Sequence, residues 1–182
     1  HGIPNYFGEQ RFGREGDNVE AAKRMFAGER VRREQRSIYL SAARSYLFNL
    51  LLAERVTQGS WNVPMDGDVW MLEGTKSIFG PEPLNDDIRA RCAALDIHPT
   101  GPMWGAGELR SQAAVLALES QLPVQQPELC KGLEKADLRQ EHREPEVPQH
   151  HVRRERQRPD DAGATDVAQP ERNQQDSGKS QC

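Results

Sequence analysis

The chain has 182 residues, of which 36% are hydrophobic, and it carries a formal net charge of −4 at pH 7. That length suits one domain, or a domain with a tail, and the low hydrophobic content predicts that part of the chain is unfolded. No apolar run approaches the roughly 20 residues that a membrane helix needs, so the sequence predicts no membrane span. The first residue is His1 and it lies inside a motif, so we expect the chain to be part of a longer reading frame.

The acidic net charge by itself argues against a nucleic-acid partner, because RNA binding uses cationic surface. The average conceals a crowding of arginines between Arg11 and Arg55. Such a run forms either a local basic surface or an ordinary solvated helix face, and the residues alone favour neither interpretation.

The cysteines and histidines give no sign of a metal site. The three cysteines form no CxxC pair and leave an odd count, which favours reduced thiols and a cytoplasmic protein; they are Cys92, Cys130 and Cys182. Neither Cys92 with His98 nor the adjacent His150 and His151 has zinc-ligand spacing. No glycine-rich phosphate loop occurs either, so we expect no metal and no cofactor.

The first half of the chain predicts one short strand and two helices. The segment through Gly13 has the texture of a short strand with tight turns. A helix should begin at Asp17 or Asn18 and stop at Gly28. A longer helix should span residues 33 to 58, because its apolar stripe persists for several turns before Gly59.

The second half predicts a hairpin, three helices and a tail. Residues 68 to 72 and 76 to 79 are typical of two adjacent strands, and a helix should run from Asn85 to near Asp96. Residues 98 to 105 should form an ordered loop, followed by a helix over 108 to 120. Pro127 should open a last helix. Beyond Arg139 the composition predicts disorder, since too little apolar area is available for burial.

The run NYFGEQRFG at Asn5 to Gly13 holds more aromatic and polar side chains than a core strand requires. It suits a strand edge with aromatic packing. It also suits a nucleic-acid site, because aromatics interleaved with arginine can stack on bases and contact phosphates. The residues alone leave both interpretations open.

The same run resembles the signature block of the TruD family of tRNA pseudouridine synthases. SAARSYLFNLLLAERV at Ser41 to Val56 and DIHPTGPMWG at Asp96 to Gly105 resemble later blocks of that family, in the same order. The resemblance covers Gly2 to about His142. It implies an α/β fold in which a TruD-specific domain is inserted into a pseudouridine synthase catalytic domain.

On this resemblance, residues 1 to 30 close the first part of the catalytic domain and residues 31 to 142 form the inserted domain. Residues 143 to 182 form a polar tail that departs from the family pattern, and we expect it to be disordered or the product of a frameshift. The implied reaction converts uridine 13 of tRNA to pseudouridine without metal or cofactor. The implied partner is tRNA, and the full-length protein should be a monomer.

The resemblance implies binding roles but no catalytic residue in this chain. The essential aspartate of the family lies in a Gly-x-Lys-Asp block before the NYFG run, and no aspartate here has that context. Asn5 would hold that aspartate by hydrogen bonding, Phe7 would stack on the target uracil, and Arg11 would contact phosphate or brace the loop. RNA contacts are also possible for four arginines at or near the start of the long helix and along it: Arg32, Arg33, Arg36 and Arg44.

Two functions therefore remain. The chain is either a part of a tRNA-modifying enzyme that is inactive alone, or a non-catalytic RNA-binding module built on the inserted domain. Packing and capping are equally good explanations for Arg44 and for Asn49, which also matches the family.

Overall fold

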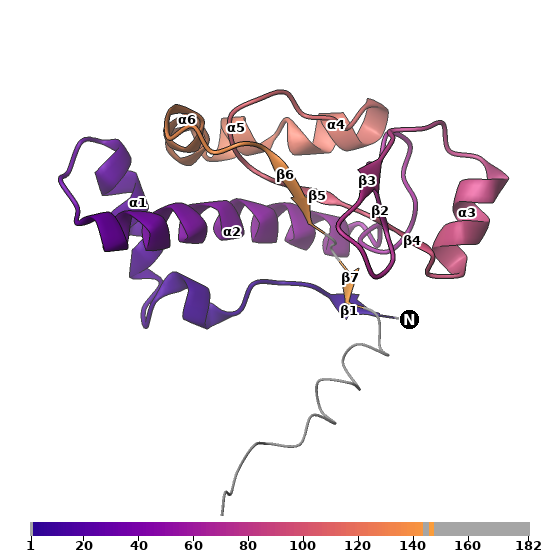
Figure 1. Cartoon of the computed structure of the whole chain (residues 1–182), viewed down its shortest axis with the longest axis horizontal. Coiled ribbons are helices and arrows are strands. Elements are labelled where there is room, and N and C mark those ends of the chain that lie inside the picture. The colour runs from indigo at the N-terminus through magenta and orange to yellow at the C-terminus, as the bar shows by residue number, and fades with distance from the viewer. Residues whose placement is uncertain (1, 144–145, 148–182) are drawn as a thin grey trace, which may run out of the picture.

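The computed structural model describes residues 2–143 and 146–147, and its central element is the long helix α2 (Arg33–Thr57). The N-terminal segment runs along one side of α2, and the later helices with β5 and β6 lie on the other side (Figure 1). The β2–β4 sheet and α3 lie toward the C-terminal end of α2 (Figure 1). This mixed arrangement of helices and strands confirms the predicted α/β class.

The two predicted N-terminal helices are confirmed. Helix α1 (Asp17–Phe26) begins after Gly16 and ends before Gly28, whose φ of 108° needs the freedom of a glycine. Helix α2 ends at Thr57, and Gly59 with φ of 68° turns the chain away. Neither helix contains a glycine or a proline in its interior, which agrees with their unbroken length.

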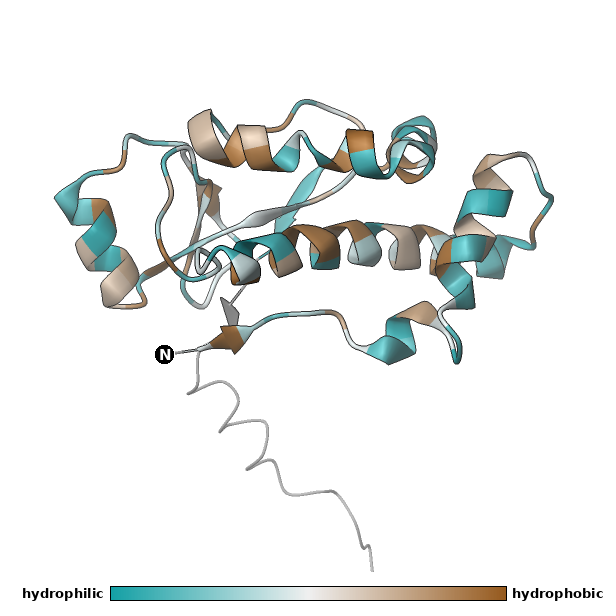
Figure 2. Ribbon diagram, turned by 180° about the vertical axis from the view of Figure 1, so that it is seen from behind, coloured by the Kyte–Doolittle hydropathy of each residue, from teal (hydrophilic) through white to brown (hydrophobic). Residues whose placement is uncertain are grey.

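The main hydrophobic core joins α1 and α2 to the last helices. It contains apolar side chains from α1, α2, α5 and α6, together with Trp104, which follows β5. Half-buried aromatic residues pack around it. Hydrophobic segments accordingly line α2 and the helices opposite it (Figure 2). A smaller cluster of Trp70, Ile88 and Ile97 joins the β-sheet to α3. Helices from both sides of the predicted boundary at residue 30 share the main core, and the domain limits stay a prediction.

The predicted hairpin is confirmed: β2 (Trp70–Leu72) pairs antiparallel with β3 (Ile78–Phe79). The loop predicted over 98–105 is wrong. Strand β4 (Ile97–Pro99) pairs with β2, and β5 (Gly101–Met103) pairs with β6 (Glu141–Arg143). The prolines that favoured a loop are tolerated here because β4 lies at the edge of its sheet and β5 belongs to a two-stranded ladder.

Helix α3 (Asp86–Ala93) starts where predicted, and the Asn85 side chain caps it by accepting a hydrogen bond from Ile88 N–H. The helix predicted over 108–120 is shorter, since α4 spans Ala113–Glu119 and a separate short α5 follows (Leu122–Gln125). Helix α6 (Pro127–Lys135) opens on its proline as predicted. Cys92 on α3 is half-buried against the smaller cluster.

The prediction of disorder directly after Arg139 is wrong for the residues that the structure describes there. Strand β6 pairs with β5, and β7 (Glu146–Val147) pairs antiparallel with β1 (Ile3–Pro4). Strand β6 has no aliphatic side chain and is held by its backbone pairing with β5 and by hydrogen bonds of His142 and Arg143. Composition alone does not reveal such contacts. The remainder of the predicted tail, together with His150, His151 and Cys182, lies outside the described residues.

A buried polar cluster ties α2 to β2 and α4. Arg55 on α2 donates two hydrogen bonds to the carboxylate of Asp68, at 2.8 Å and 3.2 Å. Glu119 on α4 is buried beside this pair and accepts a hydrogen bond from the Ser111 hydroxyl. Gly67 permits the close approach of this segment to the chain before α4, because a Cβ there would lie 1.8 Å from the Gln112 carbonyl oxygen.

No helix in the described ranges is both long and apolar enough to cross a membrane. Within residues 2–143 and 146–147, no three His, Cys, Asp or Glu side chains are grouped as metal ligands.

Candidate functional site

The NYFGEQRFG block lies along α2. After β1 it continues in an extended path to Gly8, and the short 3-10 helix η1 (Glu9–Phe12) follows. Arg11 N–H donates to the Gly8 carbonyl at 3.0 Å, which closes this turn. The predicted short strand is β1, directly before the block, and the block itself is an irregular segment followed by a 3-10 turn.

Asn49 on α2 fixes the backbone of Phe7. The Phe7 N–H donates to Asn49 Oδ1 at 2.9 Å, and Asn49 Nδ2 donates to the Phe7 carbonyl at 3.0 Å. The Phe7 ring meets the neighbouring Phe48 ring edge to face, with centroids 5.7 Å apart and planes at 82°. Two consecutive residues of α2 therefore set both the backbone and the ring of Phe7.

Two arginines flank the Phe7 ring. The guanidinium of Arg143, at the end of β6, lies 3.8 Å from the ring centroid, and that of Arg11 lies 5.3 Å from it. Arg143 also donates a hydrogen bond of 2.7 Å to Asn5 Oδ1. Arg143 is 138 residues from Asn5 in sequence, and it brings Asn5 and Phe7 into one cluster.

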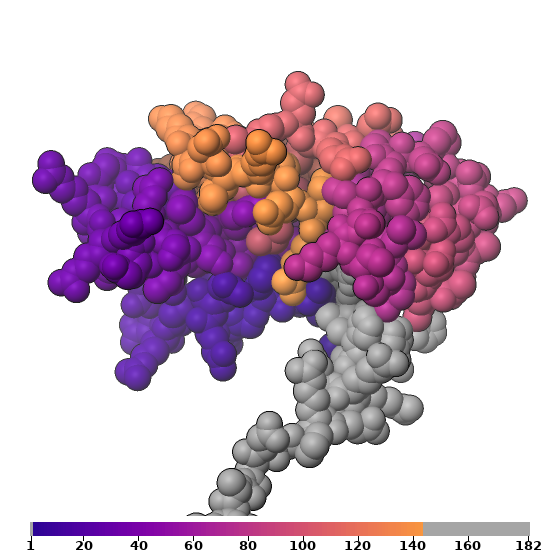
Figure 3. Space-filling view, viewed as in Figure 1, coloured from indigo at the N-terminus to yellow at the C-terminus, as the bar shows by residue number. Residues whose placement is uncertain are grey.

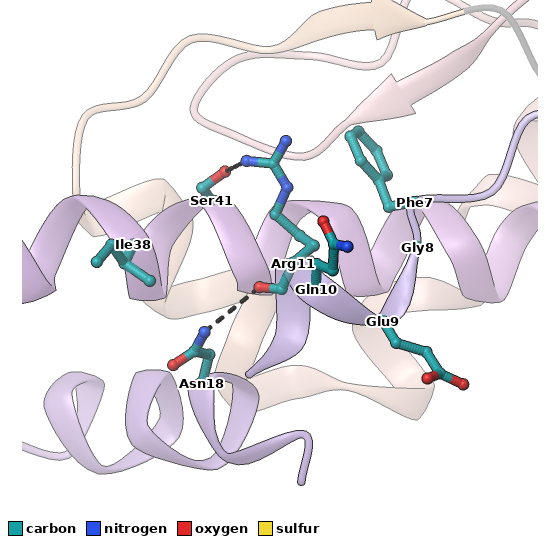
Figure 4. Close-up of a pocket in the computed structure, with 8 residues that line it drawn as sticks. All are labelled: Phe7, Gly8, Glu9, Gln10, Arg11, Asn18, Ile38 and Ser41. Atoms are coloured by element: carbon teal, nitrogen blue, oxygen red, sulfur yellow. Dashed lines mark hydrogen bonds between the residues drawn. The ribbon is translucent and has the colours of Figure 1, made fainter. Parts of the chain in front are cut away.

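Arg11 points across a cavity toward α2. Its Nη1 donates to Ser41 Oγ at 2.8 Å, and its carbonyl accepts from Asn18 Nδ2 at 3.4 Å (Figure 4). The cavity has a volume of 670 Å³, and its lining residues Phe7 and Ile38 appear on opposite sides of Arg11 (Figure 4). Arg11 is thus exposed at a hollow surface and braced at one nitrogen.

A second cavity of 750 Å³ lies on the other side of Phe7, toward the β2–β3 hairpin. The β6 residues and the exposed Lys76 of the hairpin are among the residues that line it. In the space-filling view, the β6 residues lie between the N-terminal segment and the hairpin (Figure 3). Phe7 lines both cavities, so it borders two hollows at the surface.

His142 in the wall of the second cavity is neutral near pH 7. Burial, helped by the positive charge of Arg110, lowers the pKa of its imidazole to about 4. The Thr100 hydroxyl donates to the Val69 carbonyl at 2.8 Å, so at 2.9 Å it accepts a hydrogen bond from His142 Nδ1–H. The second cavity therefore receives no positive charge from His142.

The arginines predicted on α2 divide into two groups. Arg44 donates from Nη2 to the carbonyls of Met103 and Arg139, at 2.8 Å and 2.9 Å, and lies 3.6 Å from the Glu141 carboxylate. Burial lowers the pKa of its guanidinium. Of the two roles open to Arg44, these contacts favour packing. The exposed side chains at the start of α2 form no ion pair within the described part of the chain; they are Arg32, Arg33 and Arg36.

Sequence reasoning missed Arg143 and Lys76 at this site. Arg143 fell in the segment assigned to a polar tail, and only its pairing with β5 brings it to Phe7. Asn49 was noted for its match to the family, but its two hydrogen bonds to Phe7 depend on tertiary structure. A lone lysine in a hairpin turn carries no signal in the sequence.

Comparison with known proteins decides the family. The family model for tRNA pseudouridine synthase D (TruD) matches residues 14–129. This chain belongs to the TruD family. The matched span starts directly after the NYFGEQRFG block and includes α1, α2 and the β2–β4 sheet. The family predicted from the three sequence blocks is confirmed.

Curated relatives in the TruD family are close in sequence. The tRNA pseudouridine synthase D of Xanthomonas campestris pv. campestris (strain 8004) is 51% identical over 158 residues, covering 78% of this chain and 43% of the relative. That of Aeromonas hydrophila subsp. hydrophila is 49% identical over 143 residues, covering 78% and 41%. The chain thus spans less than half the length of these TruD relatives.

A crystal structure from Methanosarcina mazei, of a protein named tRNA pseudouridine synthase D (TruD), has the same fold. The TM-score is 0.57 at 15% identity, and the match covers 81% of this chain and 52% of that protein. The likeness supports the TruD fold of this chain.

Proposed function

We propose that this chain is part of an enzyme that isomerises uridine 13 of tRNA to pseudouridine. The relatives that share about half of its residues are named tRNA pseudouridine synthase D. The observation that carries the proposal is the placement of Phe7, whose backbone is held by Asn49 and which lines two surface cavities. An aromatic ring held in this way suits stacking on a base that is turned out of its helix.

The proposed roles follow the family pattern. In the reaction, the glycosidic bond breaks, the base turns, and a carbon–carbon bond forms to the same ribose. Phe7 stacks on the uracil, and Asn5 donates a hydrogen bond to the catalytic aspartate. No aspartate of this chain has the Gly-x-Lys-Asp context, so in this proposal the aspartate is supplied from outside these residues. In this proposal, Phe7 and Asn5 bind the uridine and orient the aspartate, and neither takes part in bond breaking.

The phosphates of the tRNA are the proposed ligands of the cationic side chains around Phe7. Arg11 keeps one guanidinium nitrogen for Ser41, which leaves donors for a phosphate at the first cavity. Lys76 stands at the wall of the second cavity. The exposed Arg32, Arg33 and Arg36 extend the basic surface at the start of α2.

The wider organisation is proposed on the same basis. Residues 1–30 would belong to the catalytic domain and 31–142 to the inserted domain. We propose a monomeric, cytoplasmic enzyme that needs neither metal nor cofactor. A second function, a non-catalytic RNA-binding module, is favoured by the same exposed arginines. Both functions require tRNA binding, and only the first requires the aspartate.

A titration with tRNA over a salt series tests the binding that both functions share. Replacing Arg32, Arg33 and Arg36 by glutamine should weaken binding. The slope of log affinity against log salt should also fall by about 1 for each phosphate that these side chains no longer neutralise. Filter binding of the 182-residue chain measures both quantities.

The control removes the same charge elsewhere, at Arg89, Lys131 and Lys135, all exposed. This control should keep the salt slope of the unmodified chain. Weak tRNA binding by the unmodified chain, with an affinity that does not depend on salt, would overturn the proposed function. Equal salt slopes for the two triple variants would show that the arginines at the start of α2 do not contact phosphates and form an ordinary solvated face.

A further inference from the structure

We infer that Arg143 is a positioning residue of the proposed uridine site, which fixes the ring of Phe7 and the orientation of the Asn5 carboxamide together. The inference rests on the proposed function and goes beyond it, because it assigns a role to a residue outside the NYFGEQRFG block. Its basis is a single side chain that contacts both residues, at 3.8 Å from the Phe7 centroid and 2.7 Å from Asn5 Oδ1.

Arg143 is anchored to α2 through β5. Its backbone pairs with Gly101, and a Cβ at Gly101 would lie 3.1 Å from Phe48 Cε2. The absence of a side chain at Gly101 therefore lets β5 and β6 approach Phe48 closely. The guanidinium of Arg143 also lies 5.5 Å from the Phe48 centroid. It therefore approaches the pair of rings Phe7 and Phe48 from β6, while α2 carries Phe48.

Arginine suits this position because of its shape and its hydrogen-bonding groups. The planar guanidinium stacks on an aromatic face and donates in its own plane, which a lysine ammonium does not do. One guanidinium can thus cover one face of Phe7 and bind Asn5 at once. In this inference, the base stacks on the face of Phe7 that Arg143 does not cover.

The hydrogen bond to Asn5 determines which way its amide points. Arginine only donates, so the atom of Asn5 that it contacts must be the carbonyl oxygen Oδ1. The amide nitrogen Nδ2 is thereby turned to the other side as a donor. A carboxylate only accepts, so Asn5 must present Nδ2 if it is to hold the catalytic aspartate. Arg143 enforces the orientation that this role requires.

The test compares Arg143→Lys and Arg143→Gln with Arg139→Lys and Arg139→Gln in the 182-residue chain. Arg139 is a matched control because it lies in the same segment with an exposed side chain. The affinity of each protein is measured for a tRNA transcript with uridine 13 and for the same transcript with an abasic residue there. The ratio of the two affinities isolates base stacking, because both RNAs carry the same phosphates.

The unmodified chain and both Arg139 variants should prefer the uridine transcript by about tenfold, and both Arg143 variants should lose most of that preference. The lysine variant keeps the net charge, so a loss of the uridine preference in that variant would be due to the missing planar guanidinium contact. An unchanged ratio in both Arg143 variants would overturn the inference.

A second measurement separates failure of the inference from failure of the proposed function. In NMR spectra of the labelled chain without RNA, the Phe7 ring and Asn5 carboxamide signals should shift in the Arg143 variants and not in the Arg139 variants. If the unmodified chain shows no uridine preference while these signals shift, the proposed uridine site fails and the positioning contact stands. Signals that match the unmodified chain would overturn the contact itself.

Discussion

Replacing Arg55 by alanine should lower the free energy of unfolding by about 3–5 kcal/mol. Arg55 and Asp68 are 2% and 0% exposed, and their two hydrogen bonds measure 2.8 Å and 3.2 Å. Arg55 also donates from Nε and Nη2 to the Ser60 carbonyl. The alanine variant leaves the Asp68 carboxylate buried without its cation, beside a second buried acid, Glu119. Burial already raises the pKa of Asp68 against the opposing effect of Arg55.

Urea unfolding followed by tryptophan fluorescence measures this loss, because Trp70 and Trp104 are buried. Arg89→Ala is the control, since Arg89 is exposed on α3, and it should change stability by no more than about 0.5 kcal/mol. Equal stabilities for the Arg55 and Arg89 variants would show that the buried pair does not hold α2 to β2.

The same cluster should make the stability of the chain fall as pH rises from about 5 to 8. Burial raises the pKa of the Glu119 carboxyl from 4.5 to about 7, although the Ser111 hydroxyl and Arg55 oppose the shift. The protonated acid is thus favoured in the folded state. Its contribution is fully present below pH 4.5 and is lost as pH rises through about 7. A shift of this size corresponds to about 3 kcal/mol at most.

Glu119→Gln keeps the shape of the protonated acid and cannot ionise. Unfolding curves at a series of pH values should therefore show a smaller pH dependence for this variant between pH 5 and 8, with the largest gain over the unmodified chain at the alkaline end. Glu108→Gln is a matched control at an exposed position. Parallel pH profiles for the Glu119 variant and the unmodified chain would contradict the buried, raised pKa.

Helices α1, α2, α3 and α6 could be predicted from sequence because their apolar residues follow a period of 3.6 and their ends carry glycine, asparagine or proline. Helix α4 lacks such end residues, so its predicted range was too long, and the short α5 was missed. Helix α2 matched its predicted range to within one residue at its end. The strands β4 and β5 could not, because Pro99, Gly101 and Pro102 are typical of loops and act as strands only through their partners. Strands β6 and β7 were missed for another reason: the polar composition after Arg139 predicts disorder, and these strands form only through pairing with β5 and β1.

The candidate site likewise has a part that could be predicted from local sequence and a part that depends on tertiary structure. The block at Asn5 to Gly13 is local, and its aromatic and polar composition identified it. Its supports come from distant parts of the chain, Asn49 from the middle of α2 and Arg143 from β6. Arg44 shows the converse: its charge suggested RNA, yet its contacts lie with the backbone carbonyls of Met103 and Arg139. The sequence shows where charged residues occur, whereas the tertiary structure determines which groups they contact.

Crosslinking tests most directly whether the NYFGEQRFG block contacts the target uridine. A tRNA transcript with 4-thiouridine at position 13 is irradiated with the chain, and the adducts are mapped after trypsin digestion. We expect an adduct on the peptide that ends at Arg11 and contains Phe7, with its yield reduced by Phe7→Leu. Adducts confined to peptides from the start of α2 or from α3, with none on the Phe7 peptide, would contradict the proposed contact.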